Sequence, residues 1–377
     1  VAARRAPKRC AGVAGSRFMN GVLHLQGSIL VGPDEVAPEV WVADGRLTFE
    51  RPSWVDAVIQ GWVLPGLADA HCHVGLERQG AVSDERAEQQ AIADRDAGAL
   101  LLRDAGSPAD TRWIDSRDDL PKIIRAGRHI ARPKRYLRNY GAEVEPDELI
   151  TEVERQAVRG DGWVKLVGDW IDRDVGDLAP LWPADLAKAA IARAHELGCR
   201  VTAHVFGEQA VAELVAAGID GIEHGTGMDD ATISLMAERR VALVPTMIQL
   251  DNFEEYARAG EEKYPAYASH IRALYASRLE RFAKALDAGV PIYAGTDAGG
   301  FLPHGLVGDE IAALAQFSSA EYALGAGSWR AREWLGHPST LVAGAPADLV
   351  VFDADPRLDL NVLRAPRFVI LRGALAT

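Results

Sequence analysis

The sequence contains little cysteine, and this scarcity excludes one class of fold. Three cysteines, Cys10, Cys72 and Cys199, occur among 377 residues, and they lie far apart. A disulfide scaffold needs an even and denser set, whereas intracellular proteins keep such thiols reduced. We therefore predict a cytoplasmic protein that is held together by a hydrophobic core.

Positive charge and long apolar runs are also scarce. The chain carries 41 lysines and arginines against 54 acidic residues, which gives a net charge of −13. Domains that bind nucleic acid usually present a basic face, so this class is disfavoured. No stretch reaches the roughly 18 uninterrupted apolar residues of a membrane-spanning helix. We therefore expect neither nucleic acid nor a membrane as a partner.

The first 18 residues differ from the rest of the chain because they are basic and carry no acidic residue. Their basic residues are Arg4, Arg5, Lys8, Arg9 and Arg17. A secretory signal would continue with an apolar segment, whereas alanine, glycine and serine follow here. We predict that 1–18 is a disordered basic leader, or sequence upstream of a translation start at Met19.

Short apolar runs alternate with amphipathic segments along the middle of the chain. Eight runs are expected to be strands: 64–74, 99–106, 122–130, 163–170, 199–205, 218–225, 241–247 and 290–299. Several are apolar throughout, which is typical of parallel strands that are buried on both faces. The segments between them, such as 183–198, end at glycine as helices often do. This alternation predicts an α/β fold, a (β/α)8 TIM barrel, over 64–341.

The two flanks of this region have a different pattern. Residues 20–63 and 345–377 contain short strand-like runs that are separated by glycine and aspartate turns. Because both ends look like β-structure around one barrel, we predict a small composite β-sandwich made from 19–63 and 342–377.

Five side chains that can bind a metal lie at the predicted carboxyl ends of strands. They are His71, His73, His204, His224 and Asp297. In a (β/α)8 barrel these strand ends meet on one face, where active sites form. His71 and His73 are two residues apart and therefore point to the same side of a strand. Imidazole and carboxylate ligands suit a divalent transition metal, zinc first, so we predict a metal site.

Lys165 lies inside the apolar run WVKLVG. A buried ammonium group is costly unless it is paired or loses its charge. Two interpretations follow from this position. Lys165 forms an ion pair at the strand end, for example with Asp169, or its amine is chemically modified and serves as a metal ligand.

Taken together, these segments resemble the amidohydrolase superfamily of metal-dependent hydrolases. The matching pieces, in chain order, are LPGLADAHCH, VKLVG, TAHV, GIEHG, AGTDAG and GAPADLVVFDADP. The similarity covers 20–377 and is greatest to the imidazolonepropionase-like and prolidase-like branch, whose eighth strand carries a similar GTDAG. It implies a hydrolase acting on a carbon–nitrogen bond of a small-molecule substrate. The bond would belong to an amide, a cyclic amide or a dipeptide, as in Xaa-Pro or Xaa-Arg dipeptidases.

The resemblance also implies two metal ions and a modified lysine. In binuclear members of the superfamily, carbon dioxide carboxylates the lysine of the fourth strand, and the carbamate bridges the ions. Carried over, the metal ligands would be His71, His73, Lys165, His204, His224 and Asp297. A metal-bound water would supply hydroxide, and Asp297 would be the catalytic proton shuttle. Imidazolonepropionase itself lacks the lysine ligand, so Lys165 argues against that activity.

Substrate-binding residues are expected in the loops that follow the strands. After the third predicted strand, Tyr136, Arg138 and Tyr140 would grip a carboxylate or the oxyanion. The other interpretation of this segment is a solvated basic loop. His304, a short distance beyond the eighth predicted strand, is a further candidate for the pocket.

Two other functions are compatible with the sequence. A mononuclear deaminase of the same superfamily would use a glutamate near the fifth strand, where Glu208 follows His204, although Lys165 disfavours it. A non-catalytic metal-binding homologue would lack a ligand, and none is missing. Ammonia release from aminopurines or pyrimidines would identify the deaminase. The sequence leaves open whether copies of the chain form a homo-oligomer.

Overall fold

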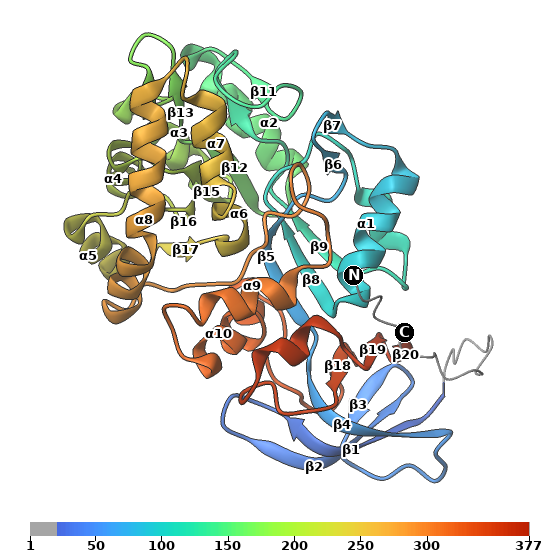
Figure 1. The fold of residues 1–377 in the computed structure, drawn as a ribbon. Helices are drawn as coiled ribbons and strands as arrows, with labels where there is room; N and C mark the ends of the chain where they lie inside the picture. Colours follow the sequence, from blue (N-terminus) through green and yellow to red (C-terminus); the bar gives the residue numbers. More distant parts are fainter. Residues whose placement is uncertain (1–20, 377) are drawn as a thin grey trace, which may run out of the picture.

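The computed structural model describes residues 21–376 (Figure 1). The predicted basic leader, 1–18, lies outside these residues. Within the described range, no helix has both the length and the hydropathy that a bilayer crossing requires. The fold is a mixed α/β arrangement, and its strands belong to a terminal sheet and to a larger body (Figure 1).

Strands from both ends of the chain form the terminal sheet, in the order β20-β19-β18-β4-β1-β2-β3. Their bounds are β1 (Leu23–Leu30), β2 (Val36–Ala43), β3 (Arg46–Thr48), β4 (Ala57–Pro65), β18 (Leu349–Phe352), β19 (Phe368–Leu371) and β20 (Ala374–Leu375). The sheet lies at the bottom of Figure 1, where blue and red strands meet. A separate hydrophobic cluster, which includes Leu25, Val40 and Val351, lies on this sheet. All seven strands belong to one hydrogen-bonded sheet, whereas the predicted β-sandwich would consist of two. The boundaries of this part, 19–63 and 342–377, stay a prediction.

Two glycines face each other where β1 and β4 run in parallel. Gly27 is paired with Gly61, and the φ of Gly27 is +126°. A Cβ atom added to Gly27 would collide with the carbonyl oxygen of Gly61. Glycine is therefore required at Gly27 both by the backbone conformation and by the close approach of the neighbouring strand.

We expect Gly27→Ala to lower the melting temperature of the protein. The backbone strain and the forced shift of β4 each cost about 1–3 kcal/mol. Circular dichroism melts would measure the change, with Gly32→Ala as the control. A Cβ atom on Gly32 would meet only Thr340 Cγ2, at 3.7 Å, so this variant should melt like the wild type. Equal melting temperatures for the two variants would contradict the close approach of β1 and β4.

The body contains two parallel sheets, β5-β8-β9 and β11-β10-β12-β15-β16-β17. Their bounds are β5 (Leu67–Cys72), β8 (Ala99–Asp104), β9 (Lys122–Arg125), β10 (Ile130–Ala131), β11 (Ala142–Glu143), β12 (Trp163–Val167), β15 (Arg200–Val205), β16 (Gly221–His224) and β17 (Ala242–Val244). Two small hairpins add β6 (Leu76–Glu77) with β7 (Gly80–Ala81), and β13 (Asp169–Asp172) with β14 (Asp177–Pro180). Seven of the eight predicted strand segments thus contain a strand.

The eighth predicted segment, 290–299, is not part of a named strand, yet it lies between the two parallel sheets. On one side, Leu243 N of β17 donates to Pro291 O at 2.8 Å. On the other side, Ala70 N of β5 donates to Ala294 O at 2.8 Å, and Asp297 N donates to His71 O at 2.7 Å. These hydrogen bonds place the end of this segment beside the end of β5.

Helices follow the strands of the body and cover them (Figure 1). Their bounds are α1 (Asp84–Asp96), α2 (Leu149–Arg159), α3 (Ala184–Glu196), α4 (Glu208–Ala217), α5 (Asp230–Arg239), α6 (Met247–Leu250), α7 (Phe253–Gly260), α8 (Pro265–Asp287), α9 (Val307–Leu314), α10 (Ala320–Ala326) and α11 (Trp329–Trp334). Helix α1 contacts β8, α2 contacts β12 and α3 contacts β15.

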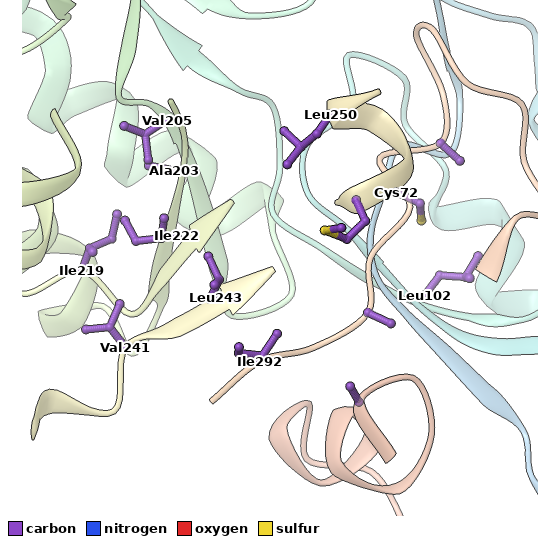
Figure 2. Close-up of a cluster of buried hydrophobic side chains, with 14 of the residues drawn as sticks. Cys72, Leu102, Ala203, Val205, Ile219, Ile222, Val241, Leu243, Leu250 and Ile292 are labelled. Carbon is purple, nitrogen blue, oxygen red and sulfur yellow. The ribbon is translucent and has the colours of Figure 1, made fainter. Parts of the chain in front are cut away.

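The core of the body is built from apolar side chains of adjacent strands. Figure 2 shows Ile222 of β16, Leu243 of β17 and Ile292 among these buried side chains. Cys72 of β5 also packs into this cluster and is fully buried. Because side chains alternate along β5, the neighbours of Cys72 project away from this core. Those neighbours are His71 and His73.

Candidate metal centre and pocket

Three of the predicted ligands converge at the carboxyl end of β5. His73 Nε2 lies 2.9 Å from Asp297 Oδ1, and His71 Nε2 lies 3.2 Å from the same oxygen. The two Nε2 atoms are 3.2 Å apart. Ligand atoms at about 2.0–2.1 Å from one tetrahedral zinc ion are about 3.3 Å from one another. The spacing of these three atoms therefore fits a single divalent ion, and within 21–376 they form a candidate metal-binding group.

Hydrogen bonds determine which nitrogen of each ring faces this point. His71 Nδ1 lies 2.7 Å from Glu223 Oε2, and His73 Nδ1 lies 2.7 Å from the Gly106 carbonyl oxygen. Both partners accept hydrogen bonds, so each Nδ1 donates and each Nε2 faces the point where the three side chains meet. Histidines that bind metals usually have such an outer partner, which fixes the tautomer and the orientation of the ring.

The other two histidines form a second pair at the ends of β15 and β16. His204 Nδ1 lies 3.0 Å from His224 Nε2, and His224 Nδ1 lies 2.7 Å from Thr246 Oγ1. Burial lowers the pKa of His224 to about 3 and holds the pKa of His204 well below its usual value. Both rings are therefore neutral, which is the form that binds metals. The ring centroids of His71 and His224 are 5.6 Å apart, so the two pairs are adjacent.

Lys165 lies on β12, and its side chain is buried. Its Nζ has no hydrogen-bond partner among the described residues. Burial lowers the pKa of the Lys165 amine to about 8, while the charge of Glu223 acts in the opposite direction. The suggested ion pair with Asp169 does not form, because the Asp169 carboxylate accepts hydrogen bonds from the backbone N–H groups of Phe206 and Gly207 instead. The ion-pair interpretation of Lys165 with Asp169 is therefore wrong.

A buried ion pair supports His71. Glu223 Oε1 accepts a hydrogen bond from Arg103 Nη2 at 2.6 Å, and its other oxygen contacts His71. The Arg103 guanidinium stacks on the rings of Trp163 and Trp334, 4.7 Å and 5.0 Å from the two ring centroids. Burial opposes ionisation of Glu223, but Arg103 and His71 hold its pKa well below the usual range. Glu223 is therefore an ionised acceptor for His71.

Three residues of this region have a left-handed backbone conformation. The φ values are +66° at His224, +50° at Thr246 and +56° at Asp297. A positive φ is uncommon for residues other than glycine, and such strain is concentrated at functional sites. At all three positions the chain bends at or just after the end of a strand segment, and the bend brings the side chain to the candidate centre.

The candidate centre opens into a pocket of about 580 Å³, a volume typical of small-molecule sites. The histidines that line it are His73, His129, His204 and His224, and the carboxylates are those of Asp297 and Glu255. Its aromatic walls are formed by Tyr136, Tyr140, Trp170, Phe206, Tyr256, Tyr264, Tyr267 and Phe301. The pocket therefore combines polar groups at the centre with an apolar lining.

Comparison with known sequences places the chain in a family. The sequence model of the Amidohydrolase family matches residues 177–375, which is more than half of the chain. The chain belongs to the amidohydrolase family. The matched region includes His204, His224 and Asp297, while the first two histidines and Lys165 precede it.

Two relatives show how far the similarity of this amidohydrolase extends. An uncharacterized protein of Mycobacterium tuberculosis is 56% identical over 354 residues, which cover 93% of this chain and 95% of the relative. The ochratoxinase of Aspergillus niger is 26% identical over 230 residues, which cover 59% of this chain and 47% of that enzyme.

Solved structures support the fold of the amidohydrolase. A Xaa-Pro dipeptidase with methionine bound in its active site superposes with a TM-score of 0.80 at 22% identity, covering 94% of this chain and 99% of that chain. The ochratoxinase of A. niger superposes with a TM-score of 0.78 at 19% identity, covering 94% and 95%. At these identities the similarity establishes the fold.

The predicted substrate-binding residues of this amidohydrolase divide into two groups. Tyr136 and Tyr140 line the pocket. Arg138 is exposed and is not among the lining residues. His304 is also outside the lining, because its Nδ1 pairs with Asp94 Oδ2 of α1 at 2.7 Å. The structure thus brings two of the four candidates to the pocket.

Among the lining residues of the amidohydrolase that the sequence did not indicate are His129 and Arg78. His129 is buried, and its ring centroid lies 5.0 Å from that of His73. Its position at the end of the third predicted strand, like that of the other histidines, was a signal that could have found it. Arg78 also lines the pocket, but no pattern in the sequence distinguishes it from other surface arginines.

Proposed function

We propose that this protein hydrolyses an amide-type carbon–nitrogen bond of a small molecule with the help of two divalent metal ions, zinc first. The observation that carries the proposal is the convergence of His71, His73 and Asp297 within 3.2 Å of one another, beside a pocket of about 580 Å³. Membership of the amidohydrolase family supports the reaction class. So does the likeness to a Xaa-Pro dipeptidase, an enzyme that cleaves a peptide bond.

The donor set of the site fits two ions. His71, His73 and Asp297 would hold the first, and His204 with His224 would hold the second. His204 Nε2 and Lys165 Nζ are buried at the site and have no hydrogen-bond partner within 21–376. Buried polar atoms usually have a partner, so a bound ligand would explain both. When bound, the ions would lower the pKa of a water molecule toward 7 and polarise the substrate carbonyl group.

Lys165 would join the two metal positions as a carbamate. Its pKa of about 8 leaves part of the amine uncharged near neutral pH. The uncharged amine would form a carbon–nitrogen bond with carbon dioxide and release one proton, which yields a carboxylated Nζ with two oxygens. A buried ammonium group would thereby become an anionic ligand, which removes its need for an ion-pair partner.

Asp297 would be the proton shuttle of the reaction. Burial opposes ionisation of its carboxyl group, but His71 and His73 hold its pKa well below the usual range. An ionised carboxylate can accept a proton from the attacking water and deliver it to the leaving nitrogen, as general base and then general acid. The alternative deaminase reading loses support, because Glu208 pairs with His270 at 2.8 Å and does not line the pocket.

We also interpret the two parallel sheets of the body as parts of one (β/α)8 barrel over 64–341. The segment 290–298 would be its eighth strand, since its backbone hydrogen-bonds to both β17 and β5. In such a barrel the carboxyl ends of the strands form one face. This arrangement would account for the meeting of β5, β12, β15 and β16 at the candidate centre.

We expect the purified protein to contain two zinc or other divalent ions per chain, measured by inductively coupled plasma mass spectrometry. Removal of the ions with a chelator should abolish hydrolysis of a panel of dipeptides, N-acyl amino acids and lactams, and added zinc should restore it. Full turnover by metal-free protein would contradict the proposal. Ammonia release from aminopurines would identify a deaminase, and a full metal complement without any hydrolysis would identify a non-catalytic homologue.

A further inference from the structure

Among the lining residues of the pocket, Arg78 carries the positive charge. It is exposed in the turn between β6 and β7, and its guanidinium carbon lies 4.9 Å from the centroid of the Phe301 ring. The adjacent acid, Glu77, pairs with Arg86 at 2.6 Å, and within 21–376 Arg78 has neither an ion pair nor a side-chain hydrogen bond. Stacking on an aromatic ring holds a guanidinium group without using its N–H donors. Those donors therefore remain available to a ligand.

A second polar group lies near Arg78. Tyr140 Oη is buried, lines the pocket, and has no hydrogen-bond partner in the described part of the chain. It is adjacent to Gly300, because a Cβ atom on that glycine would lie 2.8 Å from this oxygen. Burial raises the pKa of Tyr140 to about 12; the charge of Asp297 also raises it, and the charge of Arg78 lowers it. Phe301, on which Arg78 stacks, directly follows Gly300, so one short segment lies against both Arg78 and Tyr140 Oη.

The remaining wall of the pocket favours an uncharged group. Trp170, Phe206 and Tyr267 present aromatic surface to the pocket, and the lining contains two acids, Asp297 at the centre and Glu255 exposed on α7. An apolar, aromatic acyl group would bury its surface against this wall, which is favourable.

We propose that Arg78, together with Tyr140 Oη, determines specificity by binding the carboxylate of an N-acylated amino acid whose uncharged, aromatic acyl group lies against the aromatic wall. A guanidinium group binds a carboxylate through two parallel hydrogen bonds, and a phenol hydroxyl group can donate a third. The inference rests on the proposed hydrolysis, since it names the substrate class for the same site.

The test compares N-benzoyl-L-alanine with its N-methylamide and follows release of benzoate by chromatography. The variants are Arg78→Gln, Arg78→Lys and the control Arg367→Gln, which removes the charge of an exposed arginine that also stacks on a phenylalanine, Phe368, but lies outside the pocket. We expect Arg78→Gln to raise KM for the acid about 10- to 100-fold, as expected for the loss of a charged hydrogen bond, with a smaller change in kcat. Its KM for the N-methylamide should stay unchanged, and Arg367→Gln should behave like the wild type. Arg78→Lys should recover part of the affinity, because lysine keeps the charge but not the planar fork.

Two further readouts separate recognition of the carboxylate from a general effect on the fold. The KM for the acid should rise with salt in the wild type but not in Arg78→Gln, because exposed charges are screened within about 10 Å at 0.1 M salt. Calorimetric titration of N-benzoyl-L-alanine into Asp297→Asn protein, with and without Arg78→Gln, would measure binding without turnover.

The outcomes distinguish this inference from the proposed function. Binding that depends on Arg78, without turnover by the wild type, would support the carboxylate site and contradict hydrolysis. Equal turnover of the acid and the N-methylamide, unchanged by Arg78→Gln, would support the hydrolase and overturn the role of Arg78. If Arg138→Gln raises the KM for the acid and Arg78→Gln does not, the role of Arg78 is also overturned. If the wild type neither binds nor hydrolyses N-benzoyl-L-alanine, both the carboxylate site and its hydrolysis are overturned.

Discussion

Replacing Asp297 with asparagine is expected to lower kcat/KM at least about 1000-fold, because general acid–base catalysis contributes about 100- to 10,000-fold and a metal ligand is weakened as well. Asparagine has nearly the same shape as aspartate. It is also among the residues that best tolerate a positive φ, and the φ of Asp297 is +56°. The fold should therefore persist, and loss of activity would report the chemistry of the carboxylate.

A matched control for this variant is available in the terminal sheet. Asp44 is exposed and has a φ of +51°, so Asp44→Asn makes the same change in the same backbone conformation away from the pocket. We expect both variants to melt like the wild type and Asp44→Asn to keep full activity. If Asp297→Asn retains more than about a tenth of wild-type kcat/KM, general acid–base catalysis by Asp297 is refuted.

The convergence of the ligands was predictable because it depends on local patterns. The spacing of His71 and His73 places both side chains on one side of β5, and parallel strands end at a common edge. His204, His224 and Asp297 each follow an apolar run. The run that ends at Asp297 is not a regular strand, but its backbone forms hydrogen bonds to both parallel sheets. Its end therefore still lies beside the end of β5.

The partners of these ligands were not predictable, since they depend on packing between distant segments. Glu223 contacts both His71 and Arg103, which are separated from it by more than a hundred residues. His304 was expected in the pocket because it lies soon after Asp297, but Asp94 of α1 binds it elsewhere. The position of His304 in the sequence predicts the segment on which it lies. The direction in which its side chain points depends on Asp94, a buried charge from a distant segment.

The terminal sheet illustrates the same limit for the fold. Strand-like runs at both ends of the chain were evident from alternation and turn residues. Which strands become neighbours is decided by close packing at particular positions. The parallel pairing of β1 with β4 brings Gly27 opposite Gly61, and a side chain on Gly27 would collide with the carbonyl oxygen of Gly61, so this contact requires glycine at position 27. Such a requirement can be recognised only after the pairing is known.

On the proposed function, we expect removal of the Lys165 amine to reduce the metal content from two ions to one or none and to lower kcat about 100-fold or more, because a bridging ligand and its anionic charge would be lost. Lys165→Met keeps most of the buried volume, and Lys165→Ala leaves a space in which acetate could supply two carboxylate oxygens. Acetate should therefore restore part of the activity to Lys165→Ala and none to Lys165→Met. Metal analysis and kinetics would measure both effects, with the exposed Lys188→Ala as the control.

On the proposed function, the same side chain would link activity to carbon dioxide. Carboxylation requires the uncharged amine, and burial lowers the pKa of Lys165 to about 8, so carbamate formation should become less favourable as the pH falls below that value. Metal-free protein that is reconstituted with zinc in carbon dioxide-free buffer should regain less activity than protein reconstituted with bicarbonate, and the difference should be absent in Lys165→Met. If Lys165→Met binds two ions and turns over substrate at the wild-type rate, the buried amine is not a ligand.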